Sequence, residues 1–168
     1  MITFVAILLV LLMLAVCWWD ATRFTIPNWL VAAVLALYAA YFYFSPTPID
    51  WQMSLGIAGL AFVLGLGLFA GNIMGGGDVK LLTVCCLWAG KEAILPYILV
   101  TALIGGALSI FMLAGRPIAA FIWLKMFKRK KLPRLLESGE PIPYGLAIAG
   151  GILLLLFQNK LSGIHLVL

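Results

Sequence analysis

The stretch WQMSLGIAGLAFVLGLGLFA, residues 51–70, contains twenty residues without a single charge. A helix of about 20 apolar residues is long enough to cross a hydrocarbon core of roughly 30 Å. Other apolar stretches lie on both sides of it, and the whole chain has a mean hydropathy of +1.16. Only 10% of its 168 residues are charged, against about 25% in a typical soluble domain. These features predict an all-α membrane protein.

We expect about six transmembrane helices in a single integral-membrane domain that covers residues 1–168. Each expected span is a mostly apolar run, and charged or turn-forming residues separate one run from the next. The fourth and sixth runs are the shortest. The expected spans are Ile2–Trp19, Trp29–Phe44, Trp51–Ala70, Val79–Ala89, Ala93–Ala114 and Tyr144–Phe157.

The positive charges predict how these spans are oriented. If the spans cross in sequence, the connections 20–28, 71–80 and 115–143 lie on one side of the membrane. They carry nine of the eleven Lys and Arg residues, so the bias of basic residues toward the inside makes this side cytoplasmic. Both termini are then expected on the non-cytoplasmic side.

The net charge of +5 comes mainly from a basic stretch within residues 116–134. This stretch is short and lies beside apolar spans, which favours contact with anionic lipids over binding to nucleic acid. Within the cytoplasmic loop 116–140, Pro117–Phe127 is expected to form either an interfacial amphipathic helix or the cytoplasmic end of a longer fifth span.

Two acidic residues stand at the cytoplasmic ends of spans. Asp20 ends the first span and Asp78 begins the fourth, so the orientation places both on the same side. An acid near the hydrocarbon region costs about 2.5–3.5 kcal/mol and is a functional candidate for that reason. Two carboxyl groups that share one proton can activate a water and polarise a carbonyl, which hydrolyses an amide without a metal.

Other catalytic chemistries find little support in the sequence. The one histidine, His165, lies in the tail, and there is no H-E-x-x-H motif. The three cysteines lie within apolar segments and form no C-x-x-C pair. We therefore expect no metal site and no cofactor.

The residues around the two aspartates are candidates for shaping the site. Gly75, Gly76 and Gly77 lack Cβ atoms, so the backbone there can adopt unusual dihedral angles and approach a substrate closely. Alternatively, they form a plain turn before a helix. Lys80 either places a cation near the aspartates or extends to the membrane surface, and Arg23 either pairs with a carboxylate or has a structural role.

Asn28 is another candidate in the connection that follows Asp20. It comes directly after Pro27, where it is expected to cap the second span, so its role is structural or site-shaping.

These motifs resemble those of the type IV prepilin peptidases, which are aspartyl intramembrane proteases with a G-x-G-D signature. GGGDVKLL at 75–82 fills that signature, and DATRFTIPNWL at 20–30 is similar to the segment around the first aspartate of the family. IPYGLAIAGG at 142–151 looks like the opening of the last helix, with Pro143, Tyr144 and Gly145. The resemblance covers most of residues 1–157.

The resemblance implies an aspartic endopeptidase of the bacterial inner membrane, with Asp20 and Asp78 as the catalytic pair. It implies that the substrate is a prepilin or pseudopilin whose short basic leader is cut off at the cytoplasmic face. Two-domain members of the family also carry a four-cysteine zinc insert and N-methylate the new terminus. The short connection after the first span lacks such an insert, so the chain is similar to the branch that serves tight-adherence (Flp) pili.

Three alternatives remain open. A preflagellin-type signal peptidase would differ mainly in its substrate. A small ion-coupled transporter would also use intramembrane acids, but it is expected to show inverted repeats and acids near the midplane, and neither is found. A non-catalytic assembly scaffold would tolerate the loss of both aspartates.

Overall fold

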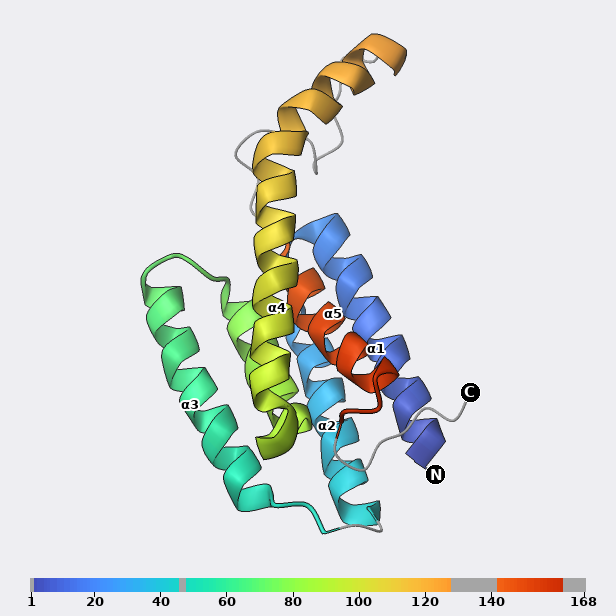
Figure 1. The fold of residues 1–168 in the computed structure, drawn as a ribbon, viewed down its shortest axis with the longest axis vertical. Coiled ribbons are helices and arrows are strands. Elements are labelled where there is room, and N and C mark those ends of the chain that lie inside the picture. Colours follow the sequence, from blue (N-terminus) through green and yellow to red (C-terminus); the bar gives the residue numbers. More distant parts are fainter. Residues whose placement is uncertain (1, 46–47, 128–141, 162–168) are drawn as a thin grey trace.

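The computed structural model describes residues 2–45, 48–127 and 142–161, and these residues form α-helices joined by short connections without any strand. The predicted all-α fold is therefore confirmed for this part of the chain. The helices pack side by side as a bundle (Figure 1). They are α1 (Ile2–Arg23), α2 (Asn28–Phe44), α3 (Trp51–Ala70), α4 (Gly76–Phe127) and α5 (Tyr144–Phe157).

Helix α4 contains both the fourth and the fifth expected spans. They are separated at Gly90, whose backbone is non-helical with φ 57° and ψ −170°. Only glycine adopts this left-handed region without strain. The α4 ribbon turns back on itself in Figure 1, so we describe a first arm (residues 76–89) and a second arm (residues 91–127). The expected break at residues 90–92 is thus present as a turn at Gly90.

The number of membrane crossings remains a prediction. Three helical stretches are long and apolar enough to cross a membrane, namely Ile2–Arg23, Trp51–Ala70 and Gly76–Met126. Helices α2 and α5 are apolar but have only 17 and 14 residues. At 1.5 Å per residue they extend about 25 Å and about 21 Å, less than a core of roughly 30 Å. The second arm includes Pro117 and continues to Phe127 as part of α4 rather than as a separate interfacial helix. The remainder of the expected 116–140 segment lies outside the described residues.

The bundle has two ends with different connections (Figure 1). Helix α1 ends, the first arm begins and α5 begins at one end, which we call the aspartate end because Asp20 and Asp78 lie there. The turns at residues 48–50 and at Gly90 lie at the opposite end, where Lys91 pairs with Asp50 at 3.2 Å.

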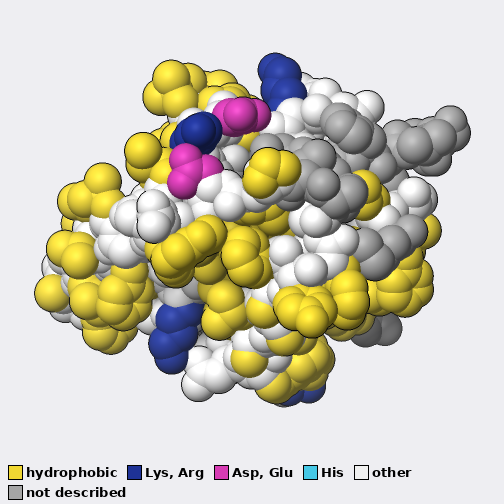
Figure 2. Space-filling view, turned by 90° about the horizontal axis from the view of Figure 1, so that it is seen from below, with side chains coloured by type: hydrophobic (Ala, Val, Ile, Leu, Met, Phe, Trp, Pro, Cys, Tyr) yellow, Lys and Arg dark blue, Asp and Glu magenta, His cyan; other side chains and the backbone are white. Residues whose placement is uncertain are grey.

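Apolar side chains fill the centre of the bundle and also cover much of its outside. Exposed large apolar side chains occur along the helices, for example Phe4, Leu60 and Leu103, as expected of helices that face lipid. Figure 2 views the molecule from below, at the end opposite the aspartates, and shows many hydrophobic side chains there beside a few charged ones. Cys17 is half-buried, Cys85 and Cys86 are buried, and none forms a disulfide. Core side chains that are fully buried include Leu9, Met13, Val16, Leu30, Val34, Leu81, Tyr97, Ile148, Ile152, Leu155 and Leu156.

Glycine allows the closest contact between α3 and the first arm of α4. A Cβ atom on Gly65 would lie 2.7 Å from Cγ1 of Val79. Gly67, two residues further along α3, has open space around it, so Gly65 and not Gly67 allows this approach. The contact fixes Val79, and therefore its neighbour Asp78, against the end of α3.

Candidate active site

Asp20 lies in the last turns of α1 and is 3% exposed. The helix ends at Arg23, and Phe24 follows in the left-handed region with φ 53°. The backbone N–H of Phe24 donates to the carbonyl oxygen of Asp20 at 2.9 Å, which closes the last turn. This turn directs the chain away from the helix while the Asp20 side chain stays inside the bundle.

The Asp20 carboxylate faces the beginning of α5. The backbone N–H groups of Gly145 and Leu146 lie within interaction range of it, and no side chain of its own segment caps α5. The first N–H groups of a helix have no partner within the helix and favour a negative charge. The start of α5 is therefore a favourable place for the negative charge of Asp20.

Gly145 makes this approach possible. A Cβ atom at this position would lie 2.7 Å from Oδ2 of Asp20 and 2.8 Å from Cδ1 of Ile26. Any larger residue would push α5 away from the carboxylate. The Pro-Tyr-Gly sequence at the start of α5 thus has a local reason: Pro143 stands at the N-cap position, and Gly145 leaves room for Asp20.

Asp78 is half-buried in the first turn of α4. Its carboxylate turns back toward the backbone N–H of Gly75, the geometry in which an acidic residue caps the beginning of its own helix. Gly77 lies against the connection that follows Asp20, because a Cβ atom on it would be 3.1 Å from Cβ and 3.2 Å from the carbonyl oxygen of Ile26. This contact brings the first turn of α4 next to the end of α1.

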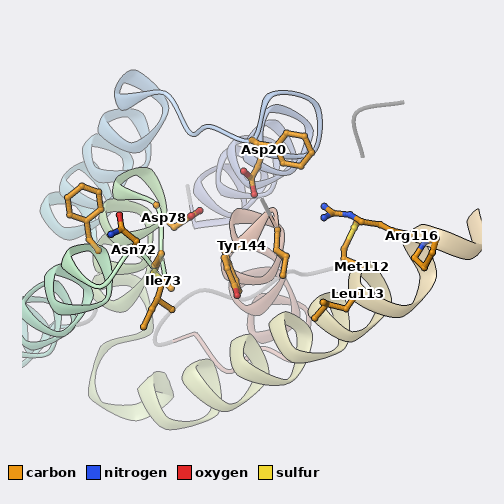
Figure 3. A pocket seen from close by; sticks show the side chains of 14 residues that line it. Asp20, Asn72, Ile73, Asp78, Met112, Leu113, Arg116 and Tyr144 are labelled. Carbon is orange, nitrogen blue, oxygen red and sulfur yellow. The ribbon is translucent and has the colours of Figure 1, made fainter. Parts of the chain in front are cut away.

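The two aspartates open into the same cavity of about 830 Å³ at the aspartate end (Figure 3). We call it the aspartate cavity. Both also line a smaller cavity of about 240 Å³, walled by residues 24–26 and 75–77. The residues that line the aspartate cavity are Asp20, Phe24, Phe69, Asn72, Ile73, Met74, Gly75, Asp78, Met112, Leu113, Arg116, Pro117, Ile142 and Tyr144.

Each carboxyl group keeps one oxygen without a hydrogen-bond partner in the described part of the chain. These atoms are Oδ2 of Asp20 and Oδ1 of Asp78, and both are buried. The charges of the two groups also act on each other. Because buried polar atoms in proteins are nearly always paired, these oxygens are suited to bind a polar group that enters the cavity. Both oxygens therefore offer a hydrogen-bond acceptor to a polar group in the cavities that the two aspartates share.

The structure brings together some of the predicted site residues. Gly75 and Tyr144 line the aspartate cavity, while Gly76 and Gly77 line the smaller one. Gly76 and Gly77 are the first residues of α4 and have helical backbones. The irregular backbone expected there is not found, and these two glycines permit close packing instead.

Three predicted residues lie outside both cavities. The Lys80 side chain donates a hydrogen bond to Oδ1 of Asn28 at 2.9 Å, which ties α4 to α2 at the surface. Asn28 is the first residue of α2 and does not cap it, because Pro27 occupies the N-cap position. The guanidinium of Arg23 lies over the Trp19 ring, 4.5 Å from its centroid.

The sequence did not single out several residues of the aspartate cavity. Asn72 has a left-handed backbone with φ 55°, and an asparagine just after a helix-ending glycine is a recognisable signal for such a turn. Arg116 belongs by sequence to the basic stretch within residues 116–134, but it lines the cavity. No local signal in the sequence marks Met112, Leu113 or Ile142, which reach the cavity only through the packing of the helices.

The apolar helices have the character of a membrane protein, and the aspartate cavity contains two acidic side chains. Residues 7–110, which include both aspartates, match the model of the type IV leader peptidase family, so the chain belongs to this family. It is therefore a leader peptidase-type protease of membrane character. No curated protein and no solved structure matches the chain.

Proposed function

We propose that this peptidase is an aspartic endopeptidase that removes the short basic leader from prepilin-like substrates at the cytoplasmic face of the bacterial inner membrane. Asp20 and Asp78 are the catalytic pair. The observation that carries the proposal is their shared cavity, in which each carboxyl group keeps one buried oxygen without a partner among the described residues. Membership of the leader peptidase family supports the same reaction class.

In this mechanism one carboxyl group is ionised and the other is protonated. The ionised group takes a proton from a water, whose oxygen attacks the carbonyl carbon of the scissile peptide bond, while the protonated group donates to the carbonyl oxygen. The C–N bond then breaks, and the leaving nitrogen takes up a proton from the pair. The products are a free carboxyl group on the leader and a free amine on the mature protein.

The remaining candidate residues support this geometry. Gly75 and Tyr144 shape the wall of the aspartate cavity, and Gly145 sets the position of Asp20. Pro143 starts α5, and Gly76 and Gly77 let the first turn of α4 approach Ile26. Lys80, Arg23 and Asn28 stabilise the surface of the aspartate end and do not contact substrate.

Charge supports the cytoplasmic placement of the site. In the described part of the chain, Arg23, Lys80 and Arg116 lie at the aspartate end, and Lys91 and Lys160 lie at the other. This asymmetry matches the bias of basic residues toward the inside. Lys125, near the end of α4, extends the positive charge toward anionic lipid headgroups.

The direct test is cleavage of a synthetic prepilin-type peptide, with a basic leader followed by an apolar helix, by purified full-length protein. Asp20→Asn and Asp78→Asn each replace a carboxylate with an amide of the same shape. Each is expected to lower kcat by about 10³-fold or more, as removal of one member of a catalytic unit does.

Asp50→Asn is the matched control, because Asp50 lies at the opposite end and pairs with Lys91. It is expected to keep wild-type kcat. The catalytic assignment is rejected if either Asp20→Asn or Asp78→Asn cleaves the peptide within tenfold of wild type. A preflagellin-type leader peptide, run in parallel, decides between the two substrate classes.

A further inference from the structure

Another cavity lies at the opposite end of the bundle from the aspartates, beside the turn at Gly90. We call it the far-end cavity. Its volume of about 130 Å³ equals that of about four water molecules at roughly 30 Å³ each, so it accepts a small group and not a peptide segment. Its lining includes Tyr38, Asp50, Ser54, Trp88, Lys91 and Glu92.

The charged side chains of this cavity leave one negative charge unbalanced. Lys91 pairs with Oδ2 of Asp50 at 3.2 Å, while Oδ1 of Asp50 accepts the backbone N–H of Met53 at 3.2 Å. Glu92 forms no ion pair with any described residue. Both acids are exposed, so a ligand can reach them, and Figure 2 shows acidic side chains beside a basic one at this end. Two carboxylates and one ammonium group give the lining a net negative charge at neutral pH, which attracts a cation.

Aromatic rings form the buried wall of the far-end cavity. Trp88 of the first arm stacks on Tyr41 of α2 with ring centroids 5.6 Å apart, and it meets Tyr38 edge to face at 5.3 Å. The indole N–H of Trp88 is already engaged, because it donates to the carbonyl oxygen of Val34 at 3.4 Å. The rings therefore present π-electrons and not an N–H donor, and such rings attract cations.

The Tyr38 hydroxyl is a polar group that this wall leaves unsatisfied. Tyr38 is 9% exposed, and its oxygen is buried without a hydrogen-bond partner among the described residues. The Ser54 hydroxyl is close enough to interact with it, but Ser54 donates its own hydrogen to the carbonyl oxygen of Asp50 at 3.0 Å. Because buried polar atoms are nearly always paired, the Tyr38 oxygen is suited to accept an N–H from a bound group.

We propose that the far-end cavity binds the primary ammonium group of a zwitterionic phospholipid headgroup, such as that of phosphatidylethanolamine. The ammonium N–H groups donate to Glu92 and to the Tyr38 hydroxyl, and the positive charge lies against the aromatic wall. A quaternary ammonium has no N–H group, so it leaves both acceptors unpaired. Lys91 complements the phosphate of the same headgroup, which a free amine lacks.

An apolar cavity beside the far-end cavity favours a lipid over a free amine. It has a volume of about 300 Å³ and lies between the start of α1 and the end of α2, where Val5 and Leu37 line it. Tyr41 lines both cavities, so the two adjoin at this ring. The exposed Phe4 also lines the apolar cavity, which is therefore open to the hydrocarbon of the membrane. A molecule that combines an ammonium group with an acyl chain matches both cavities.

The experiment measures lipid binding to the purified full-length protein by native mass spectrometry. The protein in detergent receives an equimolar mixture of phosphatidylethanolamine and phosphatidylcholine with identical acyl chains. The two lipids then differ only in their primary and quaternary ammonium groups. Wild-type protein is expected to bind its first lipid with a preference of about fivefold or more for phosphatidylethanolamine, since this lipid alone donates charge-assisted hydrogen bonds to the cavity.

Variants of the two acceptors test the proposed contacts. Glu92→Gln and Tyr38→Phe are each expected to reduce the preference to about twofold or less. Glu92→Asp keeps the carboxylate and is expected to retain a larger preference than Glu92→Gln. Tyr43→Phe is the matched control, because Tyr43 also lies near the end of α2 but is 80% exposed and lines neither cavity. It is expected to keep the wild-type preference.

Thermal unfolding distinguishes recognition from a merely structural role. Tyr38→Phe removes a buried polar group that lacks a partner, so in phosphatidylcholine alone this variant is expected to unfold at the wild-type temperature or higher. A ligand stabilises the folded state that binds it. Added phosphatidylethanolamine is therefore expected to raise the Tm of wild type more than that of Tyr38→Phe.

Four results would overturn the inference. The first is equal binding of the two lipids by wild type. The second is a full preference for phosphatidylethanolamine that survives in Glu92→Gln or in Tyr38→Phe. The third is a lower Tm of Tyr38→Phe in phosphatidylcholine together with the loss of both lipids, which indicates a structural role. The fourth is displacement of the lipid by free ethanolamine at the same concentration, which indicates a site for a soluble amine. Lipid binding is measured without substrate, so loss of the proposed peptidase function would not affect these outcomes.

Discussion

Replacing Gly145 with alanine tests whether the start of α5 positions Asp20. The added Cβ atom would lie 2.7 Å from Oδ2 of Asp20 and 3.0 Å from its Cγ. Ordinary contact begins near 3.4 Å, so the carboxyl group or the helix must move by about 0.7 Å. A displacement of about 1 Å at a catalytic group costs roughly 10²-fold in rate. We therefore expect kcat to fall by about 10- to 100-fold.

The effect of Gly145→Ala on stability is expected to be much smaller than a loss of folding. Overpacking costs about 1–3 kcal/mol, and alanine in a helix recovers about 0.5–1 kcal/mol relative to glycine. The net loss in the free energy of unfolding is then roughly 0–2.5 kcal/mol. Gly106→Ala is the matched control, because Gly106 is also helical and has no atom within 4 Å of an added Cβ.

The assay compares kcat for the prepilin-type peptide, per folded molecule, in wild type and the two variants. Thermal unfolding in detergent measures the folded fraction. Gly106→Ala is expected to match wild type, while Gly145→Ala remains folded and loses activity. Wild-type kcat in folded Gly145→Ala would refute the reasoning that this glycine sets the position of Asp20.

Two further predictions concern the first turn of α4 and the far end of the bundle. Gly77→Ala places a Cβ atom 3.1 Å from Cβ of Ile26, so the first turn of α4 must shift by a few tenths of an ångström. The kcat for the prepilin-type peptide is expected to fall about tenfold. An unchanged kcat would contradict the proposed packing. Asp50 accepts the backbone N–H of Met53 and pairs with Lys91, which together hold the pKa of Asp50 below its ordinary value of 3.8. Its contribution to stability is therefore present above pH 3.8 and is lost as the pH falls through the lower folded-state pKa. The difference in Tm between wild type and Asp50→Ala is expected to shrink between pH 7 and pH 3, and a difference that stays constant would contradict this linkage.

The sequence was sufficient to predict that Asp20 and Asp78 lie at the same end of the bundle, where both line one cavity. Alternate crossings place the end of the first helix and the beginning of the fourth at the same end of a bundle, whatever the details of packing. The fourth helix could be predicted although its apolar run is short. Without a crossing there, the basic residues after it would lie on the opposite side of the membrane from those before it. The chain reverses at Gly90, and helix continues directly on both sides of this residue. No periodic pattern of apolar residues reveals so short a turn.

The sequence did not show which neighbours of the aspartates face the cavity. Lys80 is two residues after Asp78, and residues two apart on a helix point to different sides. Its side chain therefore reaches Asn28 instead of the acids. Arg23 lies four residues after Trp19, on the same side of the helix, and stacks on that ring.

Contacts across the bundle explain the other differences between the expected and the observed features of the site. The glycines before Asp78 suggested an irregular backbone, but Gly77 is helical and needed for its contact with Ile26. Arg116 belongs by composition to a basic surface stretch, and only the packing of the second arm over α5 directs it toward the aspartates. These features depend on residues far apart in the chain, so local patterns do not predict them.

The most direct test of the catalytic pair is the kcat of the double variant Asp20→Asn/Asp78→Asn beside the two single variants. Two groups that act on the same water and carbonyl form one unit, and removal of either member disables it. The double variant is therefore expected to have a residual kcat within about threefold of each single variant. A double-variant loss equal to the product of the two single losses would contradict a shared catalytic role for Asp20 and Asp78.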